Sequence, residues 1–292
     1  MNKYHPRLLH SYPGLLLFGD HVFPYTFFVF NPITQEEITI KHTLGAGSIC
    51  GFYLCPLTRE LKILYAKVRS RGCQYLIYTI WSQTWRRIRS PALNSIPTYL
   101  SPAIVNGAMH WIMDREFGEE DGIPPCSIAI LMFRLDTEEL SHMPHLGTQR
   151  SSRQSRECRT HETMSLLVKE EHLSFCQLRI HEKAMDIWIL EDCEMWAWIR
   201  SYRVNLDLDV NVFPYHSPSA YCESELIHWG MAQFVKPSSI HDGELLICWS
   251  LRGLFLYDLD GNTVRRIEPQ GRSSTLTPFT CMPYTKSLRH IV

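Results

Sequence analysis

The sequence predicts an all-β fold built from short antiparallel strands. Helical periodicity is scarce, because almost no stretch of the chain repeats apolar residues every three or four positions. Short apolar runs are instead interrupted by 17 prolines and 15 glycines. A strand, a polar turn and a returning strand recur five times along the 292 residues. These three observations favour a series of β-hairpins over a helical or mixed fold.

The first hairpin is the most complete. An aromatic strand at residues 27–30 runs into the turn Asn31-Pro32-Ile33-Thr34, and a β-branched strand returns at residues 38–40. Asn and Pro are typical of tight turns. The other copies are residues 75–80 with 82–85, residues 128–134 with 136–138, residues 186–190 ahead of Trp196, and residues 254–259 with 260–262.

The spacing of these hairpins predicts a kelch-like β-propeller. Successive copies are 48, 55, 56 and 68 residues apart, measured at Phe30, Tyr78, Phe133, Ile189 and Tyr257. Four-stranded propeller repeats have roughly 40 to 50 residues, so the excess fits in loops. Each interval also has room for two more strands, such as residues 49–54 and 61–68, or residues 103–105 and 108–113. Four antiparallel strands make a blade. The irregular spacing leaves a pair of β-sandwiches as the alternative.

We predict one propeller-like domain over residues 1–292. Blades bury both faces against their neighbours, which explains why residues 245–249 are apolar without alternation. The clearest interruption is QRSSRQSRECRT at residues 149–160, which has four arginines and no large apolar side chain. Because this segment has little apolar surface to bury, we expect an exposed Arg-rich loop inserted between blades.

Composition indicates a protein of the cytoplasm, the nucleus or both. The chain has 29 Lys and Arg against 30 Asp and Glu, a net charge of -1, so no global field favours nucleic acid or an anionic membrane. The apolar run at residues 15–18 is too short for a signal peptide. Ten cysteines are scattered without a CxxC pair, which suggests small buried thiols.

One set of residues has the spacing of a zinc site. His142 and His145 precede Cys158 and His161, and four such ligands close a tetrahedral zinc site. The residues between the two pairs are polar and Arg-rich, however, whereas a zinc module normally packs apolar residues there. We therefore expect no metal. The same arginines suit phosphate or carboxylate, but interleaved aromatic residues are missing, so a solvated loop is favoured over a nucleic-acid site.

Aromatic and acidic residues offer further candidates. Eight tryptophans could supply an interaction hot spot, although their place on or beside strands favours core packing for most. The carboxylates at residues 119–121 and at Glu191-Asp192 are paired only by sequence adjacency, and neighbours on a strand point to opposite faces. The tryptophans considered are Trp81, Trp85, Trp188, Trp196 and Trp198.

No catalytic signature is present in the sequence. It contains no Gly-x-Ser-x-Gly elbow, phosphate loop or HExxH motif, and Gly45-Ala46-Gly47 is too short for a nucleotide fingerprint. We expect no enzyme activity and no cofactor. A rival interpretation is a small-ligand-binding, sugar-binding or hydrolytic propeller that uses a central channel, since that architecture hosts such functions too.

Several stretches, taken in order, resemble the plant F-box associated domain. The resemblance extends from about residue 13 to the C-terminus, and its specificity comes from finding all blocks in sequence. The blocks are NPITQEE at 31–37, GF at 51–52, PLTRELK at 56–62, WRRI at 85–88, SPAIVNGAMHW at 101–111, FRLDTEEL at 133–140, MDIWILED at 185–192, GELL at 243–246 and LYD at 256–258.

The resemblance implies a propeller-like domain that binds a target protein. In that family an F-box ahead of the propeller docks on the adaptor of an SCF ubiquitin ligase, and the target is ubiquitinated and degraded. Only residues 1–12 precede the first expected blade here, so we expect the F-box of roughly forty residues to be missing. The expected partner is a target protein, with the SCF adaptor joining only a longer form that carries an F-box, and with neither nucleic acid nor membrane.

Overall fold

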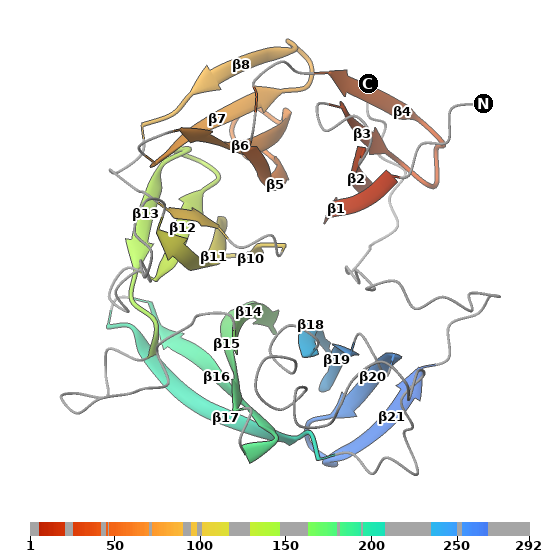
Figure 1. Cartoon of the computed structure of the whole chain (residues 1–292), viewed down its shortest axis with the longest axis vertical. Coiled ribbons are helices and arrows are strands. Elements are labelled where there is room, and N and C mark those ends of the chain that lie inside the picture. The colour runs from red at the N-terminus through yellow and green to blue at the C-terminus, as the bar shows by residue number, and fades with distance from the viewer. Residues whose placement is uncertain are drawn as a thin grey trace. The chain divides into compact units, whose positions relative to one another are not determined.

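In the computed structural model, the regular elements of the described residues are β-strands (Figure 1). The structure describes residues 6–20, 26–41, 45, 47–69, 72–89, 95–97, 101–116, 129–146, 163–179, 182–193, 195–207, 235–249 and 253–267. These residues contain no α-helix, and none of their segments is a helix able to cross a membrane. Two compact units form, one of Met1–Thr148 with Met282–Val292 and one of Gln149–Cys281.

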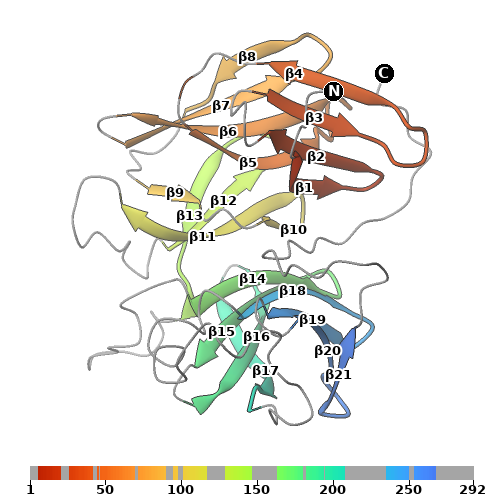
Figure 2. The ribbon, with the colours of Figure 1, turned by 45° about the vertical axis from the view of Figure 1, so that its right-hand side comes forward.

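The first unit contains three antiparallel sheets, each made of consecutive strands (Figure 2). Short turns join most neighbouring strands, so each sheet is a meander of the kind found in propeller blades. Blade 1 has β1 (Pro6–Tyr12), β2 (Leu15–Asp20), β3 (Thr26–Phe30) and β4 (Glu37–Lys41). Blade 2 has β5 (Gly47–Leu54), β6 (Leu61–Arg69), β7 (Gly72–Thr79) and β8 (Thr84–Arg87). Blade 3 has β10 (Ala103–Val105), β11 (Ala108–Glu116), β12 (Ile130–Arg134) and β13 (Leu140–Met143), with β9 (Ser95–Pro97) pairing β11.

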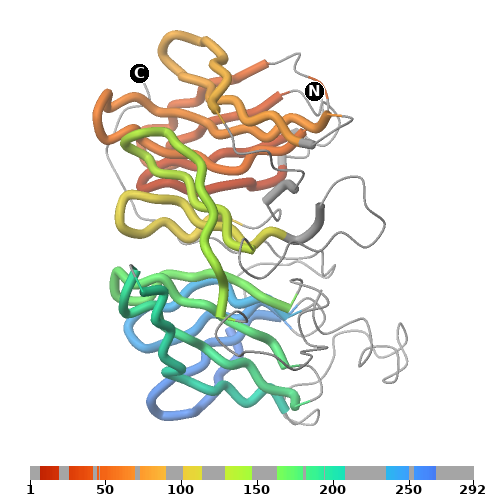
Figure 3. The backbone as a smooth tube through the Cα atoms, turned by 90° about the vertical axis from the view of Figure 1, so that its left-hand side faces the viewer, coloured from red at the N-terminus to blue at the C-terminus, as the bar shows by residue number. Residues whose placement is uncertain are grey.

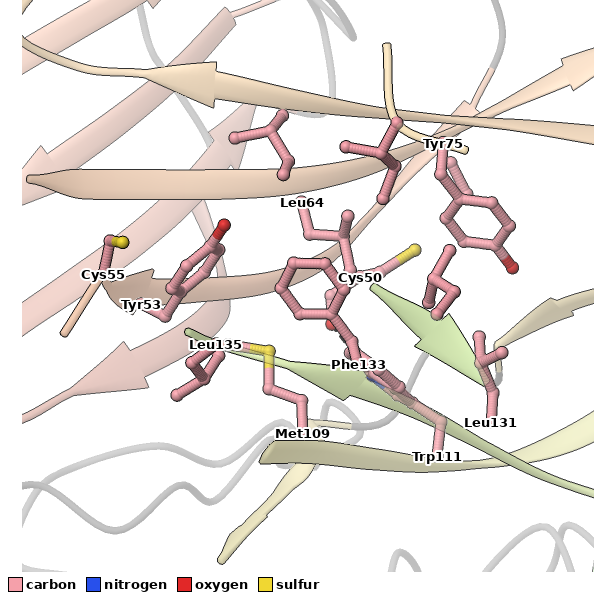
Figure 4. Close-up of a cluster of buried hydrophobic side chains, with 14 of the residues drawn as sticks. Cys50, Tyr53, Cys55, Leu64, Tyr75, Met109, Trp111, Leu131, Phe133 and Leu135 are labelled. Atoms are coloured by element: carbon pink, nitrogen blue, oxygen red, sulfur yellow. Dashed lines mark hydrogen bonds between the residues drawn. The ribbon is translucent and has the colours of Figure 1, made fainter. Parts of the chain in front are cut away.

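Blade 2 is apolar on both faces because it packs between blades 1 and 3. Strand β6 therefore has six buried residues in succession at its start, where a half-exposed strand would alternate. One face packs on blade 1 through side chains such as Ile63 and Tyr78. The other packs on Met109, Trp111 and Phe133 of blade 3 (Figure 4).

Three turns of the first unit share one backbone design. Residues 31–36, 55–60 and 134–139 are six-residue loops in which the first and last residues are joined by a backbone hydrogen bond of 2.9–3.0 Å. The fifth residue has a positive φ in each loop, 60° at Gln35, 59° at Arg59 and 56° at Glu138. Each loop has Thr at its fourth position. All three loops connect the first strand to the second, or the third to the fourth, so they emerge at the same end of their blades.

The second unit contains two further blades of four strands each (Figure 3). They share a core that includes Met185 and Ile187 of one sheet and Leu245 and Phe255 of the other. Blade 4 has β14 (Met164–Lys169), β15 (His172–Arg179), β16 (Ala184–Asp192) and β17 (Ala197–Asn205). Blade 5 has β18 (Val235–His241), β19 (Glu244–Trp249), β20 (Gly253–Asp258) and β21 (Thr263–Ile267).

All five predicted hairpins are confirmed. Each is the third and fourth strand of one blade, namely β3–β4, β7–β8, β12–β13, β16–β17 and β20–β21. The additional strands expected in the intervals are also present as β5, β6, β10 and β11. The single domain predicted over residues 1–292 stays a prediction, and the start of the predicted insertion at residue 149 coincides with the boundary between the two compact units.

Candidate recognition surface

Several predicted site residues lie outside the described part of the chain. These are the Arg-rich segment 149–160, Cys158, His161, the carboxylates 119–121 and Ala46. His142 lies on β13 and pairs with Leu131, and His145 follows two residues after that strand and is buried. Among the described residues no three His, Cys, Asp or Glu side chains form a group suited to a metal ion.

Of the five tryptophans considered from the sequence, four are buried or half-buried and one is exposed. Trp85 packs on Tyr65 and Tyr78, with ring centroids 5.7 and 4.8 Å away. Trp198 is buried against Phe175, while Trp188 and Trp196 are half-buried. Trp81 differs, because 52% of its surface is exposed at the turn between β7 and β8.

The remaining sequence candidates have local roles. Glu191 and Asp192 are both exposed at the end of β16, and the Asp192 carboxylate accepts a hydrogen bond of 3.0 Å from the backbone N–H of Met195. Gly45 has a φ of 85°, and its carbonyl accepts a hydrogen bond of 2.9 Å from the Tyr65 hydroxyl. Neither arrangement places an acid, a base and a nucleophile together.

A polar junction joins blades 2 and 3 at the end where the six-residue turns lie. The Glu138 carboxylate accepts hydrogen bonds from the Tyr53 hydroxyl at 3.1 Å and from the Lys62 ammonium at 2.9 Å. It also pairs with the guanidinium of Arg86. Burial, assisted by the Glu138 charge, raises the pKa of Tyr53 well above its ordinary value. Glu138 has a φ of 56°, and through its contacts this turn residue of blade 3 is linked to β5, β6 and β8 of blade 2.

Two buried histidines of the first unit are held in their neutral forms. Burial lowers the pKa of His10 to about 4, and its Nε2 lies 3.4 Å from the carbonyl of Ile49 on β5. Burial also lowers the pKa of His110 to about 4, with Nδ1 3.2 Å from the carbonyl of Ala103. Both imidazoles are enclosed and bonded to backbone, so we assign them to packing.

The exposed apolar side chains of blade 2 form the best candidate for recognition. Leu57 is 74% exposed in the turn between β5 and β6, and Trp81 is 52% exposed in the turn between β7 and β8. The backbone N–H of Ile80 donates to the carbonyl of Leu61 at 3.0 Å, which brings the end of one turn beside the start of the other. An exposed Trp and Leu on adjacent turns suit a protein interface more than the interior of a sheet.

Comparison with protein families decides what kind of domain this is. The family profile described as the F-box associated beta propeller domain matches residues 3–291. The chain belongs to this family. The predicted β-propeller class is thereby confirmed over the β-sandwich alternative, in agreement with the four-stranded blades. A search of curated proteins finds no match for this F-box associated domain.

Several solved structures are similar to the F-box associated domain at low identity. The β-propeller domain of the Trilobed protease from Pyrococcus furiosus is 11% identical with a TM-score of 0.45, over 93% of this chain and 85% of that one. Pyrococcus horikoshii acylaminoacyl peptidase is 11% identical with a TM-score of 0.45, over 92% of this chain and 46% of that one. TolB from Acinetobacter baumannii is 11% identical with a TM-score of 0.43, over 83% of this chain and 48% of that one. This chain thus spans less than half the length of the peptidase and of TolB.

Proposed function

We propose that this protein is a non-enzymatic recognition module that holds a target protein for an SCF ubiquitin ligase. The observation that carries the proposal is the family match over residues 3–291, since F-box associated domains serve as target-binding parts of F-box proteins. The transfer of ubiquitin belongs to other subunits of such a ligase. The proposed site of action is the cytoplasm or nucleus of a plant cell.

The chemistry of the chain supports binding over catalysis. The sequence has no nucleophile elbow, phosphate loop or metalloprotease motif. Its buried imidazoles and its Glu138 carboxylate are engaged in packing and ion pairing between strands and blades. The exposed apolar turns of blade 2 offer surface to another protein.

The proposal is tested by adding the docking module of a relative. This chain and a fusion carrying an F-box at its N-terminus are expressed in plant cells, and the proteins retained by each are identified by mass spectrometry. We expect at least one protein to be retained by both, and to become ubiquitinated and less abundant only with the fusion. The proposal fails if the fusion binds the SCF adaptor and yet no retained protein gains ubiquitin.

A further inference from the structure

Blade 2 has a local excess of positive charge that the net charge of the whole chain does not reveal. The net charge of the 292 residues is -1. Residues 47–89, which span blade 2, nevertheless contain eight Lys and Arg and a single carboxylate, Glu60. The stretch from Leu61 to Met113 contains no Asp or Glu at all. Because electrostatic interactions are screened beyond about 8 Å at physiological salt, a local excess of this kind acts on a partner that contacts the blade.

Part of this charge is neutralised within the protein and part is not. Lys62 pairs with Glu60 of its own blade and with Glu138 of blade 3, and Arg86 also pairs with Glu138. Arg69 keeps its charge, because its guanidinium donates at 2.8 Å to the neutral amide oxygen of Gln74. Among the described residues, none supplies an ion pair or hydrogen bond to the side chains of three exposed arginines. These are Arg59, Arg87 and Arg89.

The unpaired arginines lie close in the chain to the exposed apolar side chains. Arg59 shares its turn with Leu57, and Trp81 begins the turn that leads into β8. Arg87 ends β8, which is the outer strand of blade 2 and pairs with β7 on one side only among the described strands. Trp and Arg are the residue types that most often dominate binding energy in protein interfaces. An unpaired strand edge adds backbone donors and acceptors.

We propose that this basic surface, defined as Leu57, Arg59, Trp81, Arg87 and Arg89, binds an acidic segment of the target protein that also carries apolar side chains. The inference rests on the proposed function and names the chemistry of the partner. Carboxylates of the segment pair with the arginines, whose planar guanidinium groups suit them bidentately. Apolar side chains of the segment pack on Trp81 and Leu57, which otherwise remain in water.

A peptide fits this surface better than a nucleic acid does. Proteins that bind single strands stack successive bases on several exposed aromatic rings. On this surface Trp81 is the exposed ring, whereas the nearby Trp85 packs against Tyr65 and Tyr78. The apolar Leu57, 74% exposed, also has no counterpart in phosphate recognition.

The test measures binding of a defined probe to the intact chain. The probe is a fluorescent twelve-residue peptide of alternating acidic residues and Leu, compared with the same peptide carrying Gln and Asn in place of Glu and Asp. We expect fluorescence anisotropy to show binding of the acidic peptide that weakens with salt, and much weaker binding of the neutral peptide. A fluorescent single-stranded oligothymidylate serves as the nucleic-acid probe.

Variants then locate the binding to the surface. The substitutions R59E with R87E, and W81A alone, are each expected to weaken peptide binding about tenfold or more, the effect of about 1.4 kcal/mol. The matched control is K41E, which reverses an exposed charge on β4 outside the surface and leaves affinity unchanged. Because all these positions are exposed, unchanged melting temperatures verify that the variants fold.

Five outcomes of the peptide measurements overturn the inference. They are absence of peptide binding by the wild type, equal binding of the neutral peptide, preference for the oligonucleotide, unchanged affinity in R59E with R87E or in W81A, and equal loss of binding in K41E. The proposed function is judged separately, because the ubiquitination of retained proteins by the F-box fusion is measured without the peptide. If R59E with R87E still retains the same ubiquitinated target, the target binds elsewhere and only the inference about this surface fails.

Discussion

Two buried histidines make the stability of the first unit depend on pH. The pKa of His10 and of His110 falls from 6.5 to about 4 on folding because both imidazoles are buried. The unfolded chain therefore binds more protons than the folded chain between these values, so acid favours unfolding. Their contribution to stability is fully present above pH 6.5 and is lost as the pH falls toward 4. Each pKa unit corresponds to about 1.4 kcal/mol.

We predict that the free energy of unfolding drops steeply between pH 6.5 and 4, and that H10Q with H110N makes this drop shallower. The Gln amide replaces the Nε2 contact of His10, and the Asn amide replaces the Nδ1 contact of His110. Urea denaturation at several pH values measures the slope. The control is H241N, at an exposed histidine of the second unit, and an equal change of slope in this variant contradicts the assignment.

The cysteines differ in how readily they should react. Burial raises the pKa of Cys176 to about 12 and raises that of Cys50 further, so both remain as inert thiols. Cys193 is exposed at the end of β16. We predict that iodoacetamide modifies Cys193 well before Cys50 or Cys176, as measured by peptide mass mapping over time. Equal rates for the three thiols in the native protein contradict this expectation.

At the scale of elements, the outer hairpins were predictable and several inner strands were not. An outer hairpin such as β3–β4 contains an aromatic strand and a turn with Asn and Pro, and both signals are local. Strand β1 has the sequence PRLLHSY. Its proline and histidine break the usual strand pattern, although the segment forms a strand by pairing with β2. Strands of this kind form because they pair with a neighbouring strand, and their own residue pattern does not reveal that pairing.

The candidate surface was only partly predictable from sequence. Trp81 follows an apolar strand just as buried tryptophans do, and its exposure depends on the geometry of the β7–β8 turn. The charge imbalance of residues 61–113 was readable, because it needs only a count of carboxylates. Which of these charges remain unpaired could be learned only from the structure, since Glu138 pairs with Lys62 and Arg86 although both are far from it in the sequence.

The junction between blades 2 and 3 gives a prediction about stability. Replacing Glu138 by Gln removes the charge that pairs with Lys62, whose side chain is only 7% exposed. Glu60 stays 3.7 Å from the Lys62 ammonium and compensates part of its charge, so we predict a loss of about 2 kcal/mol in the free energy of unfolding, the range for a hydrogen bond to a charged group. Urea denaturation provides the measurement. The matched control is E139Q, in the same turn but exposed, and a comparable loss there shows that the turn and not the ion network is responsible.

At the scale of the whole molecule, average charge is a poor guide to partners. The chain is nearly neutral, yet blade 2 has an excess of seven positive charges. Carboxylates are correspondingly more frequent elsewhere in the chain. A repeated fold permits this uneven distribution because each blade needs only its own faces to be apolar, while its outer strand and turns vary freely.

The whole chain should tolerate loss of its Arg-rich segment. Residues 149–160 carry four arginines and no large apolar side chain, and residue 149 is where the two compact units divide. Removing such a segment sacrifices little buried apolar area, so replacing it with a Gly/Ser linker of equal length is expected to change the melting temperature by less than about 2 °C. Differential scanning calorimetry of the two proteins measures the shift, and elemental analysis checks for zinc. A fall of several degrees means that the segment is a structural element and not an insertion. One equivalent of zinc lost on replacement means that His142, His145, Cys158 and His161 form the structural site that their spacing permits. An unchanged transition supports a polar insertion whose sequence is not needed for either unit to fold.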